Sequence, residues 1–246
     1  MPKIILLLLF YSVMSFGQTL PIPAIIYPVQ EAKISSPMTG VIEKLKLKEG
    51  QTFLKGEVLV KFECHLLQAE LNKTTAVLSK KDAKYQGYRR LSQLKTISKM
   101  ELIEAQADHQ EALADNDMAK IAFDRCTITA PFSGQIIKRY AHAHEHIAEG
   151  DPLLDIVSFE EYEIKIVAPS NWIKWVKKDL PFKVKISEIN KTYDATVKRF
   201  NHYIDPVSQT FTVFGSFNEK DQLISPGMSG QAIFSQSGSE EPILHH

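Results

Sequence analysis

Two short segments of this chain repeat each other at one fixed spacing. Pro37-Met38-Thr39-Gly40 returns as Pro131-Phe132-Ser133-Gly134, and Gly56 returns as Gly150, each displaced by 94 residues. A displacement shared by several positions is hard to obtain by chance. The segment between the copies has no Pro, a single Gly and heptad-like apolar spacing. These features predict one compact β domain that is split in the chain by a long helical hairpin.

The two β halves are expected at residues 31–63 and 127–160. Gly40, Gly50 and Gly56 divide the first half into short alternating strands, because Gly supplies the positive φ angles of tight turns. Neither half is long enough to close a hydrophobic core alone. We therefore expect the halves to pair into one small flattened barrel.

The segment 64–126 is expected to form an antiparallel coiled-coil hairpin. Its first helix has a seam that steps alternately by four and three residues: Leu67, Leu71, Thr74, Leu78, Lys81, Tyr85 and Tyr88. The return helix begins at Ser98, and Glu101 three residues later completes a capping box. The side chains along its seam are smaller, which lets the two helices approach closely. The seam residues are Leu102, Ala105, His109, Ala112, Asn116, Ala119 and Phe123.

Both cysteines of the chain flank this helical segment. Cys64 immediately precedes the outgoing helix and Cys126 immediately follows the returning one, so an antiparallel pair of helices places them side by side. A disulfide forms when the two Cα atoms lie about 4.4 to 6.8 Å apart in an oxidising compartment. The alternative is a pair of free cysteines that act as small buried hydrophobic residues. Either role is structural.

The rest of the chain predicts a second small β-barrel over residues 161–236. About six strands with alternating apolar residues are expected there, joined by an N-terminal strand within 18–30. Residues 237–246 are expected to be a disordered tail. The fold class is therefore mainly β with a long α-helical hairpin.

The N-terminal residues are typical of a secretory signal. Lys3 precedes an apolar run over residues 4–14, and Ser15 and Gly17 are small residues at the −3 and −1 positions of a cleavage site. The run is shorter than the roughly 20 residues of a membrane span. We expect a signal peptide over residues 1–17 and a soluble mature chain. No Cys follows the cleavage region, so no lipid anchor is expected at the new N-terminus.

Charge and motifs exclude several classes of function. The chain has 29 basic and 29 acidic residues, so no global field would attract nucleic acid. It contains no Gly-x-Ser-x-Gly elbow, no His-Glu-x-x-His pair and no phosphate-binding loop. The sequence therefore predicts a protein that is not an enzyme.

Four passages resemble the HlyD-like membrane fusion proteins, which are periplasmic adaptors of tripartite efflux and secretion systems. They are Ile34 to Leu59, Ile97-Ser98, Thr127 to Gly134 (TITAPFSG) and Tyr203 to Gly230. The last contains Asp205-Pro206, Thr210 and Pro226-Gly227-Met228, which look most like the barrel signature of that family. Together the passages cover nearly all of the mature chain.

The resemblance implies both a fold and a set of partners. The split β domain would be lipoyl-like, a barrel-sandwich hybrid, and the hairpin would contact an outer-membrane channel of the TolC type. The second barrel would pack on an inner-membrane transporter of the RND or ABC type. The family contacts the channel through an Arg, a Leu and a Ser, for which Arg90, Leu94 and Ser98 are the matching residue types. The implied protein is a periplasmic homo-oligomer that bridges the two membranes of a Gram-negative envelope.

Two other hypotheses start from the same residues. A lipoyl-like domain can carry biotin or lipoate on a Lys between its halves, but here the helical segment occupies that turn, so no cofactor is expected. The second hypothesis is a metal-binding adaptor or metallochaperone. His142, His144 and His146 alternate, so on a strand their imidazoles would share one face, and His is a common zinc and copper ligand.

Overall fold

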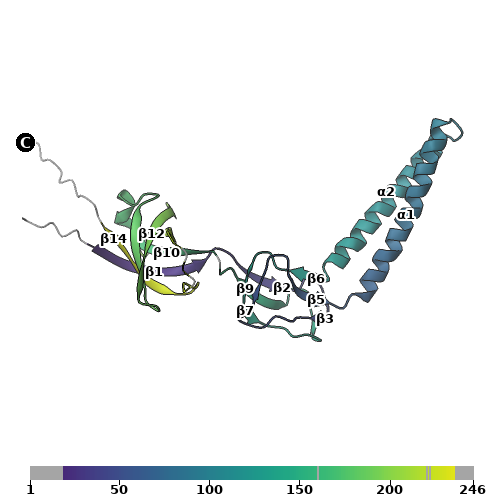
Figure 1. The fold of residues 1–246 in the computed structure, drawn as a ribbon. Helices are drawn as coiled ribbons and strands as arrows, with labels where there is room; N and C mark the ends of the chain where they lie inside the picture. Colours follow the sequence, from purple (N-terminus) through teal and green to yellow (C-terminus); the bar gives the residue numbers. More distant parts are fainter. Residues whose placement is uncertain (1–18, 160, 220, 222, 236–246) are drawn as a thin grey trace, which may run out of the picture. The chain divides into compact units, whose positions relative to one another are not determined.

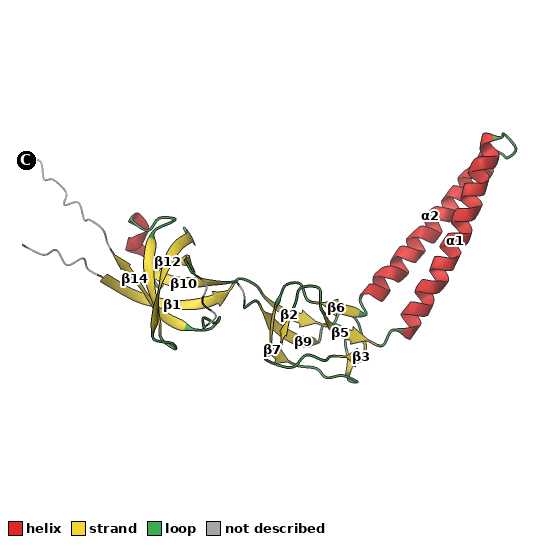
Figure 2. Cartoon of the chain, in the orientation of Figure 1, coloured by secondary structure: helices red, strands yellow, loops and turns green. Residues whose placement is uncertain are grey.

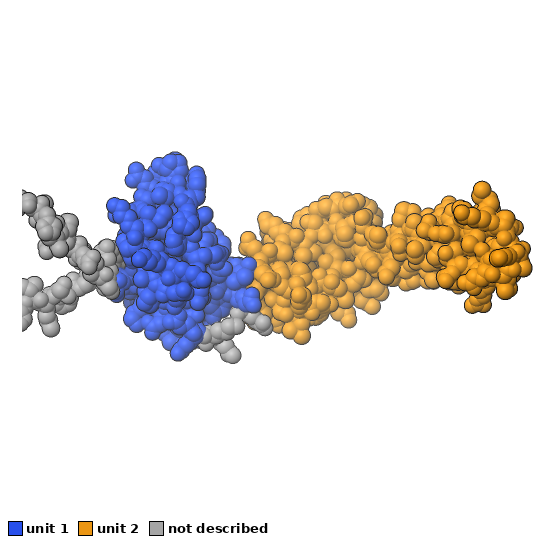
Figure 3. All heavy atoms as spheres, turned by 90° about the horizontal axis from the view of Figure 1, so that it is seen from above, with its two compact units in different colours: residues 1–29, 161–246 blue, residues 30–160 orange. Residues whose placement is uncertain are grey.

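A computed structural model describes residues 19–159, 161–219, 221 and 223–235. The expected signal peptide (1–17) and tail (237–246) lie outside the described residues. The chain divides into two compact units, which Figure 3 colours separately. Unit 1 combines the N-terminal strand, up to Val29, with the chain from Glu161 onward, and unit 2 spans Gln30–Glu160.

Unit 1 is a closed antiparallel barrel of six strands (Figure 1). In order around the barrel, the strands are β1 (Thr19–Pro28), β10 (Tyr162–Pro169), β13 (Thr210–Phe217), β12 (Lys191–Phe200), β11 (Pro181–Ile186) and β14 (Ser229–Ser235), which pairs with β1. A short 3₁₀ helix, η1 (Ser170–Lys174), follows β10. The N-terminal strand thus closes a barrel whose other strands come from the C-terminal part of the chain.

The barrel core follows from the period of two in these strands. In β11, Phe182, Val184 and Ile186 are buried while the residues between them are exposed. Phe234 stacks on Phe182 at 4.8 Å between ring centroids and meets Trp172 of η1 edge-on at 5.4 Å. The 3₁₀ helix therefore contributes an aromatic side chain to the barrel core.

Unit 2 contains two four-stranded sheets, and each takes strands from both sides of the helical segment. The first has the order β2 (Glu31–Ser35), β9 (Pro152–Val157), β7 (Gly134–Arg139), β4 (Thr52–Phe53). The second has the order β6 (Thr127–Thr129), β5 (Val58–Phe62), β3 (Gly40–Lys44), β8 (His146–Ile147). A single core of buried residues joins them, including Ile42, Phe62, Ile136 and Leu154.

The repeat of 94 residues has a direct structural cause in this unit. The N–H of Gly56 donates to the carbonyl of Ala130 at 2.8 Å, and the N–H of Gly150 donates to the carbonyl of Ser36 at 2.9 Å. Ala130 and Ser36 are themselves one repeat apart, so the two halves exchange equivalent hydrogen bonds. Both glycines have positive φ, 82° and 91°, which favours Gly at each copy.

The segment between these halves in the sequence forms two helices that lie side by side and extend away from the sheets, α1 (His65–Gln93) and α2 (Lys99–Asp124) (Figures 1 and 2). Their contacts run antiparallel: the hydroxyl of Thr74 donates to the side-chain carbonyl of Asn116 at 3.2 Å, and Lys81 pairs with Asp108 at 2.8 Å. Ala105 and Ala112 of α2 are buried. Within the described part of the chain, neither helix combines the length and apolar character needed to cross a bilayer.

The predicted fold class is confirmed at the level of its main parts. The chain is mostly β, it contains a six-stranded barrel, and it contains two helices.

Candidate functional site

The loop between α1 and α2, residues 94–98, is held by hydrogen bonds to the end of α1. We call it the tip loop. The N–H of Lys95 donates to the carbonyl of Ser92 at 2.9 Å, and the N–H of Thr96 donates to that of Leu91 at 3.1 Å. The Thr96 hydroxyl donates to the same Leu91 carbonyl at 2.9 Å. Lys95 adopts φ 59°, the left-handed conformation that ends many helices.

Ser98 begins α2 as a complete capping box. The N–H of Glu101 donates to the Ser98 hydroxyl at 3.2 Å, and the N–H of Ser98 donates to the Glu101 carboxylate at 2.8 Å. The Ser98 N–H foremost, and the Ser98 side chain after it, lower the pKa of Glu101 below its usual value. The Ser98 side chain is thus engaged in the helix cap.

The three residues predicted to contact a channel all lie at this end of the helix pair. Arg90 is exposed on the last turn of α1, Leu94 is 71% exposed in the tip loop, and Ser98 follows four residues later. Sequence reasoning missed Met100, which is 71% exposed in the first turn of α2 and adds a second apolar side chain. The tip therefore presents a cation beside apolar groups. Such a surface suits contact with another protein better than catalysis.

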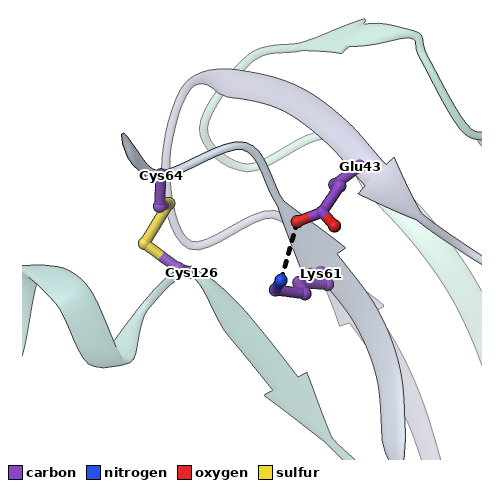
Figure 4. Close-up of a disulfide and its surroundings, with 4 residues drawn as sticks. All are labelled: Glu43, Lys61, Cys64 and Cys126. Atoms are coloured by element: carbon purple, nitrogen blue, oxygen red, sulfur yellow. Dashed lines mark ion pairs between the residues drawn. A yellow bond between two sulfur atoms is a disulfide. The ribbon is translucent and has the colours of Figure 1, made fainter. Parts of the chain in front are cut away.

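Cys64 and Cys126 form a disulfide at the other end of the helices, with their Cα atoms 6.2 Å apart (Figure 4). Cys126 is buried, and Cys64 packs against the core of the two sheets. Glu43 lies nearby in Figure 4 and pairs with Lys61 at 2.8 Å, which holds the pKa of Glu43 below its usual value. The disulfide therefore ties both helices to the sheets at one point.

The three histidines do not form the arrangement that a strand would give them. Only His146 lies in a strand, β8, whereas His144 adopts φ 72° in the preceding turn. The Nδ1 atom of His142 is 3.0 Å from a Glu145 carboxylate oxygen. The prediction that the three imidazoles share one face of a strand is wrong, because the turn at His144 interrupts the strand. Among the described residues, no group of three His, Cys, Asp or Glu side chains is placed to hold a metal ion.

Comparison with known proteins finds relatives that are longer than this chain. No family model matches it. An uncharacterized protein of Haemophilus influenzae is 32% identical over 111 residues, which cover 45% of this chain and 29% of that protein. The solvent efflux pump periplasmic linker SrpA and the toluene efflux pump periplasmic linker protein TtgG, both of Pseudomonas putida, are each 20% identical over 229 residues. The alignments cover 87% of this chain but only 60% and 59% of those linkers.

Solved structures with a similar fold cover nearly all of this chain. A chimeric MacA-MexA protein with the Pseudomonas aeruginosa MexA α-hairpin domain gives a TM-score of 0.77 at 18% identity, covering 90% of this chain and 82% of the chimera. A putative efflux transporter of Bacteroides eggerthii gives 0.73 at 18% identity, covering 93% and 72%. The membrane fusion protein Spr0693 of Streptococcus pneumoniae gives 0.72 at 13% identity, covering 89% and 100%. The chain therefore has the fold of the membrane fusion proteins, as the resemblance of its sequence predicts.

Proposed function

We propose that this chain is a periplasmic adaptor that links an inner-membrane transporter to an outer-membrane channel during efflux or secretion. Two findings support the proposal. Both Pseudomonas putida relatives are named as periplasmic linkers of efflux pumps, and the alignments to them cover 87% of this chain. The fold is that of membrane fusion proteins. The proposed role is geometric and non-catalytic: the barrel and the helix pair would each contact a different partner.

The observation that carries the proposal is the long helix pair. The disulfide fixes one end of the pair to the sheets, and the side chains at the tip loop are exposed. With 26 residues, α2 measures roughly 40 Å at 1.5 Å per residue. We take α1 and α2 as an antiparallel coiled-coil hairpin, and the two sheets as a split lipoyl-like domain. Arg90, Leu94 and Ser98 would contact a channel of the TolC type, and the barrel would contact a transporter of the RND or ABC type.

Weak contacts at each tip would become effective through repetition. In a homo-oligomer, every tip after the first binds the channel at a high effective concentration, so avidity exceeds the affinity of one contact. We therefore include a homo-oligomer of this chain in the proposal.

Partner capture tests the proposal directly. The chain is tagged, native membranes are cross-linked, and proteins that copurify are identified. An inner-membrane transporter and an outer-membrane channel recovered together support the adaptor role. Recovery of neither protein, from cells in which the tagged chain is abundant and folded, contradicts it.

Substitutions of Arg90, in the last turn of α1, and of Leu94, in the tip loop, test the channel contact. We expect Arg90→Asp or Leu94→Asp to abolish recovery of the channel, because each places a carboxylate on the exposed contact surface. The thermal unfolding midpoint should stay nearly unchanged, since both side chains are exposed. Lys120→Asp, on an exposed position of α2 far from the tip loop, is the control and should retain the channel.

Ser98 needs separate treatment because its hydroxyl also caps α2. Ser98→Ala should cost about 1 kcal/mol of stability through the lost cap alone. A fall in channel recovery counts as a contact effect only if Ser98→Asn, which restores a capping side chain without adding charge, also fails to bind. A large drop in the unfolding midpoint for Arg90→Asp or Leu94→Asp would instead mean that those residues stabilise the fold.

A further inference from the structure

One end of the barrel of unit 1 is closed by two connections between strands. At this end β10 leads to β11 through residues 170–180, which we call the η1 connection, and β12 leads to β13 through residues 201–209, which we call the β12–β13 loop. The first strand, β1, also begins here, because Thr19 pairs with Ser235 at the end of β14. The described chain therefore enters and leaves the barrel at the end that carries these connections.

Hydrogen bonds within the β12–β13 loop hold its conformation. The Asp205 carboxylate accepts from the N–H groups of Val207 and Ser208 at 3.0 and 2.8 Å, and from the Ser208 hydroxyl at 3.1 Å. The N–H of Gln209 donates to the Asp205 carbonyl at 2.9 Å. The loop is thus ordered by its own polar groups, and its apolar side chains are not needed for a core.

Those apolar side chains are directed to solvent. Val207 is 93% exposed, Tyr203 is 68% exposed and Ile204 is 38% exposed. Apolar side chains on a loop that is already ordered can be buried by a partner at little cost in conformational entropy. The β12–β13 loop therefore has the properties of a contact surface.

Lysines lie at the same end of the barrel. Lys174, Lys177 and Lys178 are exposed in the η1 connection, and among the described residues none of them has an ion-pair partner within 4.0 Å. The η1 connection and the β12–β13 loop are adjacent, because the N–H of Ser170 donates to the carbonyl of Gln209 at 2.8 Å. Unpaired cations thus accompany the exposed apolar groups.

The two ends of the barrel differ in charge. The η1 connection and the β12–β13 loop together contain three Lys and two Asp, and Asp205 is directed into its own turn. At the opposite end, where Pro28 pairs with Tyr162, residues 187–190 and 218–228 form the connections. They contain one Lys and three Asp or Glu residues. The cationic end is therefore the end that carries the apolar loop.

This combination suits an anionic membrane surface better than a protein surface. Lys is depleted at protein interfaces, whereas each Lys beside an anionic bilayer strengthens binding about fivefold. Apolar side chains insert at the boundary between headgroups and acyl chains, where Tyr is also favoured. Thr19, at this end, lies two residues after the predicted signal peptide, so the segment that directs export across a membrane leads into this end of the barrel.

We propose that this end of the barrel binds an anionic lipid bilayer directly. Val207 and Tyr203 insert among the lipid headgroups, and Lys174, Lys177 and Lys178 pair with lipid phosphates. The proposal goes beyond the adaptor function, because lipid binding requires neither a transporter nor a channel.

Vesicle flotation tests the proposal. The chain, purified after export, should float with mixed phosphatidylglycerol–phosphatidylcholine vesicles and bind vesicles of phosphatidylcholine alone several-fold more weakly. Binding to the anionic vesicles should also fall in about 1 M NaCl, where the Debye length is about 3 Å. A chain that binds neither kind of vesicle, or binds both equally, would overturn the proposal.

Substitutions at the barrel end test which residues bind. Val207→Asp should weaken binding to anionic vesicles several-fold, whereas Leu223→Asp, at a 59% exposed position of the opposite end, should not. Lys177→Glu with Lys178→Glu should also weaken binding several-fold. Its control, Lys80→Glu with Lys120→Glu on exposed positions of the helices, makes the same change in net charge and should retain binding.

A fluorescent label tests insertion of the loop. Val207→Cys carries a polarity-sensitive dye, while Cys64 and Cys126 are protected by their disulfide. Its emission should shift to shorter wavelength with anionic vesicles, and the same dye on Leu223→Cys should not respond. A label at position 207 that stays in water on bound vesicles would overturn the insertion of this loop.

The outcomes separate lipid binding from protein contacts. Thermal melts identify any variant that is simply unfolded. If folded Val207→Asp binds vesicles like the original chain but loses a transporter from cross-linked membranes, the loop contacts a protein and the lipid proposal is overturned. Vesicle binding without captured partners would support the lipid site and contradict the adaptor role. Captured partners without vesicle binding would do the reverse.

Discussion

Among the described carboxylates of the barrel unit, Asp221 accepts hydrogen bonds from three different residues. It accepts hydrogen bonds from the Lys191 ammonium at 2.6 Å, the Tyr193 hydroxyl at 2.9 Å and the Leu223 N–H at 3.0 Å. These donors, Lys191 foremost, lower the pKa of Asp221 from 3.8 to about 2. The carboxylate therefore links β12 to the loop that precedes β14.

We expect Asp221→Asn to lower the unfolding midpoint of the barrel at pH 7. Because folding lowers the pKa of Asp221, its ionised form stabilises the folded state above pH 3.8, and that stabilisation is lost as the pH falls toward 2. The difference between the variant and the original chain should therefore shrink between about pH 4 and pH 2 in thermal melts.

Asp194→Asn provides a matched comparison. Asp194 pairs with Lys183 at 2.7 Å, but both side chains are more than 60% exposed, and exposed pairs contribute little. Its substitution should leave the midpoint nearly unchanged at every pH. A difference for Asp221→Asn that stays constant down to pH 2 would contradict the assigned ionisation.

At the scale of single residues, the sequence predicts side-chain hydrogen bonds such as helix caps better than it predicts backbone angles. The capping box at Ser98 and Glu101 is visible from residue types alone, and the structure contains both of its hydrogen bonds. The turn at His144 is not visible, because positive φ is uncommon for any residue other than Gly, so His at this position does not by itself predict it. The metal hypothesis depended on that one backbone angle.

The disulfide is the element-scale feature with the largest expected effect on stability. Cys64 and Cys126 are 62 residues apart, and closing a loop of that length lowers the entropy of the unfolded chain. In the chain-entropy model the stabilisation is about 4 kcal/mol. We expect Cys64→Ala with Cys126→Ala to destabilise unit 2 by about 2 to 4 kcal/mol in urea unfolding.

Reduction of the original chain should reproduce the effect of the double substitution. The barrel of unit 1 holds neither cysteine, so its unfolding serves as an internal reference. If dithiothreitol changes neither transition while free thiols appear, the crosslink does not stabilise the fold.

The sequence also predicted the positions of helices and strands better than it predicted which strands pair. Apolar seams and glycines located the helices and short strands, since each has its own period. The exchange of hydrogen bonds between Gly56 and Ala130, and between Gly150 and Ser36, could not be derived, because the partners lie 74 and 114 residues apart in the chain. The repeat nevertheless predicted that the two halves pair with each other.

At the scale of the whole molecule, the two units have separate hydrophobic cores that share no residue. Gly215 lies in the barrel, where an added Cβ would be 2.5 Å from the ring of Phe182. Gly87 lies in α1, where an added Cβ would meet nothing within 4 Å. The same substitution should therefore have opposite effects in the two units.

We expect Gly215→Ala to destabilise the barrel by about 1 to 3 kcal/mol, because the core has no space for the methyl group. Gly87→Ala should stabilise unit 2 by about 1 kcal/mol through helix propensity. Scanning calorimetry should show each variant shifting a different transition. Both variants shifting one common transition would mean that the units unfold as a single cooperative body.

The prediction of the fold succeeded because the sequence patterns that carry it extend over most of the chain. A repeat with a helical insertion, followed by alternating strands, allows few architectures, and the similar solved structures cover about nine-tenths of the chain. Partners leave weaker signals, since a contact surface needs only a few exposed residues such as Arg90 and Leu94. Those assignments therefore depend on the experiments above.

The anchoring of both helices by Cys64 and Cys126 has a mechanical consequence. The helix pair is roughly 40 Å long, so a rotation of about 10° about the disulfide would displace the tip loop by roughly 7 Å. That displacement exceeds the width of a single side-chain contact. The disulfide restricts such rotation, so the tip loop keeps a narrower range of positions relative to the sheets of unit 2.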